Sequence, residues 1–362
     1  MRSYDAAARG VTPFTRLSSV RVGMHYQRLG RSGLRVSELC LGTMTFGARQ
    51  WGTSEQDAGP IYKMFRDAGG NFFDTANEIY SEGRSEEILG RLVKGHRDEA
   101  VIASKYSFHV PGTGNPNIAG NHRKSLKRSV EASLRRLDSD YIDVLWTHCW
   151  DGITPVEEVM RALDDLVREG KILHVGVSNT PAWVVAQSNT LAELRGWTSF
   201  IGLQIEYNLI ERAAERELLP MAAALGLSVC AWSPLASGIL SGKYGDPLDT
   251  QSKRLDTFQL KPLDERSLAI ARGVSALATR LERHPVHVAL NWLRAKKGVI
   301  PLLGARTLEQ LSDNLACLDF QLDAEQVASL DTLSAVELGY PHDFIKRTQG
   351  IVLGGFEGKI KP

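Results

Sequence analysis

The sequence predicts an α/β protein, a (β/α)₈ TIM barrel with an N-terminal β-hairpin and long loops after its third and seventh strands. Eight short apolar runs alternate with amphipathic stretches over about 300 residues, the repeat of such a barrel. Each run is apolar through most of its length, as parallel strands buried on both faces are. The alternative, a doubly wound sheet, usually carries a Gly-x-Gly-x-x-Gly turn after its first strand, and none follows the first run here.

A hairpin comes first and the barrel strands follow it. His25–Leu29 and Leu34–Ser37 are joined through Gly30 and Gly33, and they predict a hairpin that plugs one end of the barrel. The predicted barrel strands are Leu39–Gly42, Asn71–Asp74, Val101–Lys105, Ile142–His148, His174–Ser178, Ile201–Glu206, Ser228–Trp232 and Val299–Leu303.

The helices between these strands have readable ends. Thr154-Pro155-Val156-Glu157 predicts a capping box with proline at the first helical position, and Gly170 predicts the end of that helix. Thr180-Pro181 predicts the start of the next helix in the same way. Gly226 predicts the end of a later one.

One domain is expected over residues 24–362, because no linker or change in composition divides them. Residues 1–23 carry four arginines against one acid, which resembles an organelle transit peptide. The alternative is an upstream start codon or an added extension, with Met24 as the true beginning. We favour the alternative and expect this segment to be disordered or non-native.

Composition excludes several classes of function. The 362 residues hold 43 Lys+Arg and 42 Asp+Glu, a formal charge of +1, so no basic excess indicates a nucleic-acid or membrane partner. No apolar run reaches the roughly 18 residues of a membrane span. The four cysteines are scattered without a Cys-x-x-Cys pair, which favours reduced thiols in a cytoplasmic protein and argues against a structural metal.

Polar side chains stand where three consecutive strands end, the face at which barrel active sites lie. Asp74 ends the second predicted strand with Tyr80 shortly after it, Lys105 ends the third and His148 ends the fourth. An ammonium lowers the pKa of a nearby phenol, a carboxylate keeps that ammonium charged, and an imidazole can orient a carbonyl oxygen. Each residue alone has a structural explanation (a cap, an ion pair, a loop aromatic, a core imidazole), but together they favour proton donation to a carbonyl.

Two long connections, Tyr106–Gly120 and Ser233–Leu263, leave the same face and are candidate pocket walls. With them we place four aromatic residues, which favour an apolar or aromatic guest: Phe46, Trp51, Phe108 and Trp150.

From about residue 25 to 345 the sequence resembles the aldo-keto reductase family. Five segments carry the resemblance: Asn71-Phe72-Phe73-Asp74-Thr75-Ala76, Ser85-Glu86-Glu87-Ile88-Leu89-Gly90, Gly176-Val177-Ser178-Asn179, Gln204-Ile205-Glu206-Tyr207-Asn208 and Trp232-Ser233-Pro234-Leu235. Asn121-His122-Arg123-Lys124 and Trp150 are more similar to the aryl-alcohol-dehydrogenase-like branch.

The resemblance implies a catalytic tetrad. Tyr80 would be the general acid, Lys105 its pKa modulator, Asp74 the partner of Lys105, and His148 the group that orients the carbonyl. The family usually places the tyrosine five positions after the aspartate, whereas Tyr80 is six after Asp74, as if Glu78 or Ile79 were inserted.

The resemblance also implies NADP(H). Ser178, Asn179 and Gln204 would bind the carboxamide and Trp232 would stack on the nicotinamide. Further cofactor residues would be Gly42, Thr43, Met44, Asp74, Ser233, Pro234, Leu235, Ser237, Gly238, Lys243 and Gly304. Gly304-Ala305-Arg306-Thr307 opens a helix whose free N–H groups suit a phosphate, although Thr307 could simply cap it beside a solvated Arg306. Arg306 and Gln310 at the 2′-phosphate and Asn314 at the adenine would favour NADP over NAD.

The resulting hypothesis is an NADPH-dependent reductase of a small aldehyde or ketone, a monomer or homo-oligomer. One alternative is a nicotinamide-binding sensor or accessory subunit with little turnover, which a phenol misplaced by the extra residue would favour. A Schiff-base aldolase using Lys105 is another, but Asp74 argues against it by keeping the amine charged.

Overall fold

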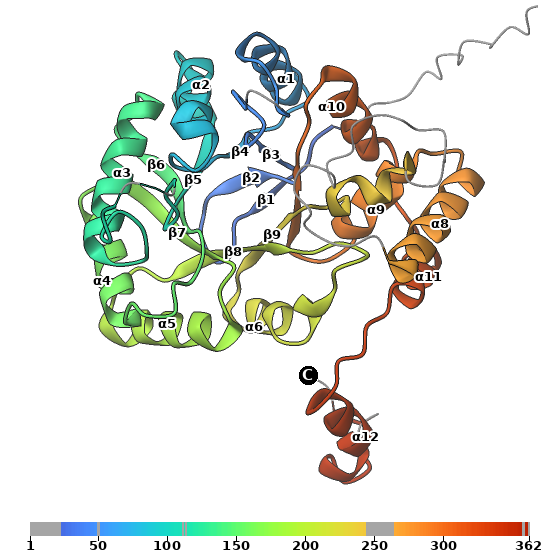
Figure 1. Ribbon diagram of the computed structural model, residues 1–362. Helices are drawn as coiled ribbons and strands as arrows, with labels where there is room; N and C mark the ends of the chain where they lie inside the picture. The colour runs from blue at the N-terminus through green and yellow to red at the C-terminus, as the bar shows by residue number, and fades with distance from the viewer. Residues whose placement is uncertain are drawn as a thin grey trace, which may run out of the picture.

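Eight parallel strands close into a barrel in the order β10-β3-β4-β5-β6-β7-β8-β9 (Figure 1). The computed structural model describes residues 23–48, 51–110, 112, 114–243, 264–356 and 359–360. The barrel strands are β3 (Cys40–Gly42), β4 (Phe72–Asp74), β5 (Val101–Tyr106), β6 (Ile142–Thr147), β7 (Ile172–Ser178), β8 (Phe200–Glu206), β9 (Ser228–Trp232) and β10 (Val299–Leu303). Each predicted strand is confirmed to within two residues at either end.

The predicted hairpin is confirmed as β1 (Tyr26–Arg28) and β2 (Arg35–Ser37), an antiparallel pair. It lies across the amino ends of the barrel strands, because the Gly30 amide donates to Ser228 Oγ at the start of β9 over 2.7 Å. Gly30 has φ +57°, and a Cβ there would come within 2.0 Å of the Ile201 carbonyl oxygen, so this contact requires glycine. The hairpin therefore closes one end of the barrel and leaves the carboxyl ends of the strands open.

The barrel interior is filled below the open end. Trp146 of β6 is fully buried there, in a cluster with Leu29 next to β1 and Val36 of β2. A Cβ on Gly176 would lie 2.2 Å from the Trp146 ring, so the indole fits only against a glycine. The barrel is a packed core with a floor, not a channel.

A ring of helices covers the outer faces of the strands (Figure 1). A second apolar cluster, which includes Ile102, Leu163 and Leu203, lies between strands and helices. The helices are α1 (Glu55–Asp67), α2 (Arg84–Val93), α3 (Arg123–Leu137), α4 (Val156–Arg168), α5 (Ala182–Arg195), α6 (Leu218–Leu225), α8 (Glu265–Arg280), α9 (Pro285–Arg294), α10 (Leu308–Leu315), α11 (Ala324–Leu333) and α12 (His342–Val352). Short 3₁₀ helices include η1 (Ser81–Gly83), η3 (Ala213–Glu215) and η4 (Ala236–Ser241).

Two predicted helix starts are wrong in their capping. The N-cap of α4 is Pro155, without a side-chain cap, because the Thr154 hydroxyl donates to the Asp151 carboxylate over 2.6 Å. The Thr180 hydroxyl likewise donates to the Ser178 carbonyl, and Pro181 is the N-cap of α5. In both cases a nearby acceptor takes the hydroxyl that was expected to cap the helix.

The predicted helix ends are confirmed. Gly226 is the C-cap of α6 with φ +67°. Gly170 follows the C-cap of α4 with φ +71°, and its amide donates to the Val167 carbonyl over 3.0 Å.

Some predictions fall partly or wholly outside the described residues. These are the extension 1–23, of which Gly23 alone is described, and residues 244–263 of the long loop after β9. Within the described segments, no helix combines the length and apolar character needed to cross a membrane. Figure 1 shows α12 standing clear of the barrel after an extended stretch, and the expectation of one domain over residues 24–362 stays a prediction.

Candidate active site

Asp74 and Lys105 form a buried ion pair at the open end of the barrel. β4 and β5 are neighbours; Asp74 is the last residue of β4 and Lys105 the last but one of β5. Lys105 Nζ donates to Asp74 Oδ2 and also to the Thr75 carbonyl over 2.7 Å. Burial has the largest single effect and lowers the pKa of Lys105, but the charge of Asp74, the neighbouring Tyr80 and the hydrogen bond to Asp74 together outweigh it. The pKa is therefore raised and the amine stays an ammonium.

Tyr80 lies beside this ion pair in spite of the extra residue before it. Lys105 Nζ is 5.0 Å from the centroid of the Tyr80 ring. The extra residue is taken up in a turn at Asn77, whose carbonyl accepts from the Tyr80 amide over 3.1 Å. Asn77 Nδ2 in turn donates to the Phe108 carbonyl over 2.8 Å, which fixes the turn against the loop after β5.

His148 follows β6 and completes the group of four. Its ring stands edge-on to Tyr80, with centroids 6.1 Å apart. Burial, and then the charge of Lys105, hold the pKa of His148 well below its usual value, so the imidazole is neutral. Its Nδ1 atom is buried and has no hydrogen-bond partner in the described part of the chain. The structure thus brings all four predicted catalytic residues together.

The predicted carboxamide residues lie next to this group, at the ends of β7 and β8. Asn179 Nδ2 donates to the His148 carbonyl and to Ser178 Oγ, both over 2.9 Å. Trp232 Nε1 at the end of β9 donates to Asn179 Oδ1 over 3.3 Å. Gln204 Nε2 donates to Asp74 Oδ1 over 2.8 Å, a link between the two sets that the sequence did not reveal.

The loop after β9 has an unusual backbone. Ser233, Ala236 and Ser237 have φ of +53°, +48° and +57°, and Gly238 has φ +95°. Non-glycine residues rarely adopt such angles. Here they fold the loop on itself: the amides of Ala236 and Gly238 donate to the carbonyls of Ser233 and Leu235 over 2.8 and 2.9 Å, and the Ser237 amide donates to Ser233 Oγ over 3.1 Å. Asn208, which sequence reasoning missed, supports the loop from below by donating to the Ser233 carbonyl over 3.0 Å. Of the other predicted residues here, Leu235 is half-buried and Lys243 is exposed.

The turn after β10 has a capped helix start and an arginine without an ion-pair partner among the described side chains. Thr307 caps α10, because its hydroxyl accepts from the Gln310 amide over 3.3 Å. Gln310 Oε1 accepts from the Arg306 amide over 2.9 Å, which occupies part of a side chain predicted to meet phosphate. The Arg306 guanidinium is half-buried and has no ion-pair partner among the described side chains. Asn314 is buried in α10.

The remaining predicted cofactor residues stand at or just after the ends of β3, β9 and β10. Gly42 ends β3, and the Thr43 amide donates to the Asp74 carbonyl over 2.8 Å. Met44 is half-buried, Pro234 after β9 is buried, and Gly304 is exposed where β10 ends.

The predicted pocket walls need one correction. Phe46 is fully buried in the outer core and cannot line an open wall. Phe108 packs on His148 with centroids 4.4 Å apart and stays 39% exposed, so it does. Trp150 packs edge-on against Trp183, with centroids 5.6 Å apart. No sequence motif had pointed to this second indole, which is exposed.

Sequence reasoning also missed a group of buried charges behind the Tyr80 loop. Glu86 of α2 is fully buried and accepts from Ser104 Oγ and Arg136 Nε, each over 2.6 Å. Glu78 accepts from His109 Nδ1 over 2.6 Å and from Arg128 Nη2 over 2.9 Å. Burial raises the pKa of Glu78, but its bonds to Arg128 and His109 outweigh this and lower it, so the carboxylate is charged.

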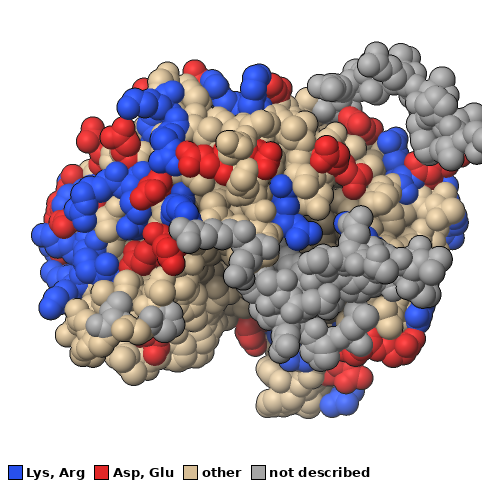
Figure 2. Space-filling view, turned by 45° about the horizontal axis from the view of Figure 1, so that its top comes forward, with Lys and Arg blue, Asp and Glu red and all other residues tan. Residues whose placement is uncertain are grey.

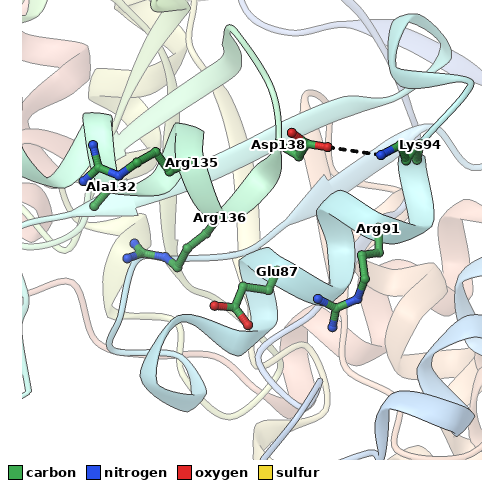
Figure 3. A pocket seen from close by; sticks show the side chains of 7 residues that line it. All are labelled: Glu87, Arg91, Lys94, Ala132, Arg135, Arg136 and Asp138. Carbon is green, nitrogen blue, oxygen red and sulfur yellow. Dashed lines mark hydrogen bonds and ion pairs between the residues drawn. The ribbon is translucent and has the colours of Figure 1, made fainter.

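Arg136 also borders a shallow groove of about 400 Å³ between α2 and α3 (Figure 3). The side chains that line it are charged apart from Ala132, and several point away from one another in Figure 3. Lys94 and Asp138 pair across one end over 3.5 Å. Figure 2 shows basic and acidic residues interspersed over this side of the molecule, and nothing in the groove converges on a ligand.

Comparison with known proteins agrees with this geometry. A sequence model described as the aldo/keto reductase family matches residues 38–335. A norsolorinic acid reductase of Emericella nidulans is 38% identical, over 90% of this chain and 85% of its own. An aryl-alcohol dehydrogenase of Pestalotiopsis microspora is 35% identical, over 94% and 87%. An aldo-keto reductase of Aspergillus calidoustus is 36% identical, over 87% and 83%.

Proposed function

This chain belongs to the aldo/keto reductase family, and from that premise we propose that it is an NADPH-dependent reductase that converts an aldehyde or ketone to an alcohol. The observation that carries the proposal is the grouping of Tyr80, the Asp74–Lys105 pair and the neutral His148 at the open end of the barrel. Together these groups make a proton donor, a fixed positive charge and a neutral orienting group around one point.

The residues present fit a nicotinamide dinucleotide. Amide side chains lie beside the tetrad, a backbone with left-handed residues follows β9, and the Arg306 guanidinium follows β10. When bound, the dinucleotide supplies the hydride for the carbonyl carbon.

The protein's own groups handle the proton. The Tyr80 hydroxyl donates it to the developing alkoxide oxygen, and the phenolate that remains is stabilised by the Lys105 ammonium. Asp74 holds that ammonium in place through Oδ2. Because His148 is neutral, one of its ring nitrogens keeps an N–H that can hold the substrate oxygen without adding a second positive charge.

The aromatic rim favours an aromatic or otherwise apolar carbonyl. Phe108 packs on His148, and the Trp150 amide donates to the Asn179 carbonyl. Trp183, near the start of α5, packs on Trp150. An aromatic guest stacks well on such side chains. The relative from Pestalotiopsis microspora is named as an aryl-alcohol dehydrogenase, which agrees with an aromatic substrate.

Preference for NADP over NAD rests on Arg306. Its guanidinium stands at the start of α10 with no carboxylate partner in the described segments, and a planar guanidinium suits a phosphate.

The test follows NADPH absorbance with a panel of aromatic and aliphatic aldehydes, for the wild-type protein and for Tyr80→Phe. We expect turnover on at least one aromatic aldehyde, and a loss of about 10²–10⁴-fold in kcat for the variant, the usual worth of general acid catalysis. Tyr62→Phe, a buried tyrosine outside the site, is the matched control. Tight NADPH binding without reduction of any carbonyl would instead favour a sensor, and equal turnover in Tyr80→Phe would remove Tyr80 from its role.

A further inference from the structure

Helix α12 is built differently from the helices around the barrel. None of its residues, His342–Val352, is buried. It stands clear of the barrel in Figure 1. His342 Nε2 meets Glu217 Oε1 over 3.1 Å, and Arg216 Nη2 donates to the Glu337 carbonyl over 2.8 Å.

One face of α12 is apolar and open to solvent. Phe344, Ile345, Ile351 and Val352 follow helical spacing and are 50%, 58%, 81% and 78% exposed. Lys346 lies on the opposite face, whereas Arg347 borders the apolar face, with its guanidinium carbon 5.6 Å from the centroid of the Phe344 ring. Isolated helices shorter than about 12–15 residues are marginal in water, so an 11-residue helix with no buried side chain needs a partner.

We propose that the apolar face of α12 packs against a second copy of this chain in a two-fold dimer. We call α12 and the described residues that flank it, from Val336 onward, the C-terminal arm. Seven of its large apolar side chains are exposed, four on α12 and three beside it: Tyr340, Phe344, Ile345, Ile351, Val352, Phe356 and Ile360. With full areas of about 150–250 Å² each, they offer roughly 900 Å² per chain, or roughly 1,800 Å² for two copies. A stable interface buries about 1,600 Å². A two-fold contact uses the same patch on both chains, so one apolar arm supplies both sides.

A membrane surface is the competing occupant, and the charge of the arm disfavours it. The described residues after 335 hold Lys346, Arg347 and Lys359 against Glu337 and Asp343. This near balance is not the polybasic face that anchors an amphipathic helix on anionic lipid.

The test measures the mass of the full chain by light scattering after size exclusion, across a range of concentrations. We expect a dimer for the wild type and a monomer for the pair Ile351→Glu, Val352→Glu. The matched control, Lys346→Gln on the opposite face, stays dimeric. A wild-type monomer at every concentration would overturn the proposal, and so would co-sedimentation of a monomer with phosphatidylserine vesicles. Because the face is not buried in the monomer, the substitutions leave the fold intact.

A second inference comes from the buried charges behind the Tyr80 loop. Glu78 lies within the lengthened segment between Asp74 and Tyr80, and its side chain is only 12% exposed. It is bound by His109 and Arg128, and Arg136 Nη2 lies 3.4 Å from Glu78 Oε2. Three side chains, His109, Arg128 and Arg136, therefore hold the loop that carries Tyr80 through the Glu78 carboxylate.

The same network of ion pairs and hydrogen bonds extends to β5, the strand that carries Lys105. Arg136 also donates from Nε to Glu86, and Glu86 accepts from Ser104, the residue before Lys105. One guanidinium thus joins the Tyr80 loop to β5 through two carboxylates. Buried charges that share partners in this way keep a fixed geometry, because any movement leaves one of them unpaired.

We infer that Glu78 is a positioning residue that holds Tyr80 against Lys105, and that it compensates for the extra residue in the loop. The inference rests on the proposed function, because Glu78 acts through Tyr80.

The test compares Glu78→Gln with Glu82→Gln, an exposed glutamate in η1 on the same loop. We expect Glu78→Gln to lower kcat about tenfold or more with KM for NADPH within about twofold, and Glu78→Asp to restore part of it. The pH at which alcohol oxidation reaches half its maximum should rise, because the phenol loses part of the influence of Lys105. Adding Glu78→Gln to Tyr80→Phe should cost nothing more.

The outcomes separate the two claims. If Tyr80→Phe reduces as well as the wild type, the proposed function fails. If Tyr80→Phe loses activity but Glu78→Gln does not, or if their losses multiply, the positioning role fails. Should Glu78→Gln not fold, Arg128→Gln removes a partner that is itself 37% exposed and carries the same test.

Discussion

The two halves of the open end of the barrel differ in whether their charged groups have partners within the protein. On the side of β4, β5 and β6 the charged groups already have partners: Lys105 with Asp74, and Glu78 and Glu86 with Arg136. On the side of β9 and β10 the site consists of left-handed backbone and the Arg306 guanidinium, which pairs with no described carboxylate. The charges of the first half are paired within the protein, and under the proposed function a cofactor phosphate would pair the Arg306 guanidinium of the second. Substitutions should therefore cost folding stability on one side and cofactor affinity on the other.

The largest effect is expected from Lys105→Met. The variant should lose at least about 10³-fold in kcat/KM, because phenol and carbonyl lose the positive charge beside them. It should also lose about 3–5 kcal/mol of unfolding free energy, since Asp74 stays behind as an unpaired buried charge. Urea unfolding and NADPH-coupled assays measure the two losses. Adding Asp74→Asn should restore most of the stability and none of the activity, and a double variant as unstable as the single one would contradict this explanation.

Arg306→Gln tests the opposite half. KM for NADPH should rise about ten- to a hundredfold while kcat and the unfolding free energy stay near wild type, because the side chain serves a phosphate and no protein group. KM for NADH should hardly change. Comparing the two cofactors on the same variant makes the measurement, and an equal rise for both would rule out a 2′-phosphate role.

The neutral state of His148 predicts a dependence of stability on pH. A histidine whose pKa is depressed in the fold takes up its proton only on unfolding, so stability is retained above its unfolded pKa of about 6.5 and lost as pH falls below it. Between pH 7 and pH 5 this residue should account for up to about 2 kcal/mol. Urea unfolding at both pH values, for wild type and His148→Gln, isolates that share. An identical pH dependence in both proteins would show that His148 is not the group responsible.

The smallest effect is expected from Thr307→Ala. Loss of the α10 cap should lower the unfolding free energy by about 1 kcal/mol and raise KM for NADPH by less than Arg306→Gln does. Thermal unfolding and steady-state kinetics together make the comparison. If instead the cap variant weakens NADPH binding more than Arg306→Gln, the backbone start of α10 matters more than the guanidinium.

Much of the fold could be predicted because its signals are local. Buried parallel strands are short apolar runs, and Asp74, Lys105 and His148 stand out as the polar residues that end or follow them. The same logic found the hairpin and the glycines that end α4 and α6.

What escaped prediction depends on contacts between distant segments. Gln204 donates to Asp74, 130 positions away in the sequence, and Arg136 donates to Glu78, 58 positions away. Helical and strand periodicity describe neighbouring residues only, so neither contact could be predicted from the sequence pattern. Phe46 was expected at a wall because aromatic residues near a mouth often line it, but burial is decided by the helices that cover it. The Thr154 hydroxyl went to Asp151, a choice between two acceptors that spacing alone does not rank.

The hairpin floor and the indole of Trp146 have a consequence for the order of events. With the amino end of the barrel closed, the proposed function requires cofactor and substrate to enter and leave through the carboxyl end alone. If one of them lies beneath the other, it must bind first and leave last, and product-inhibition patterns would show which one does.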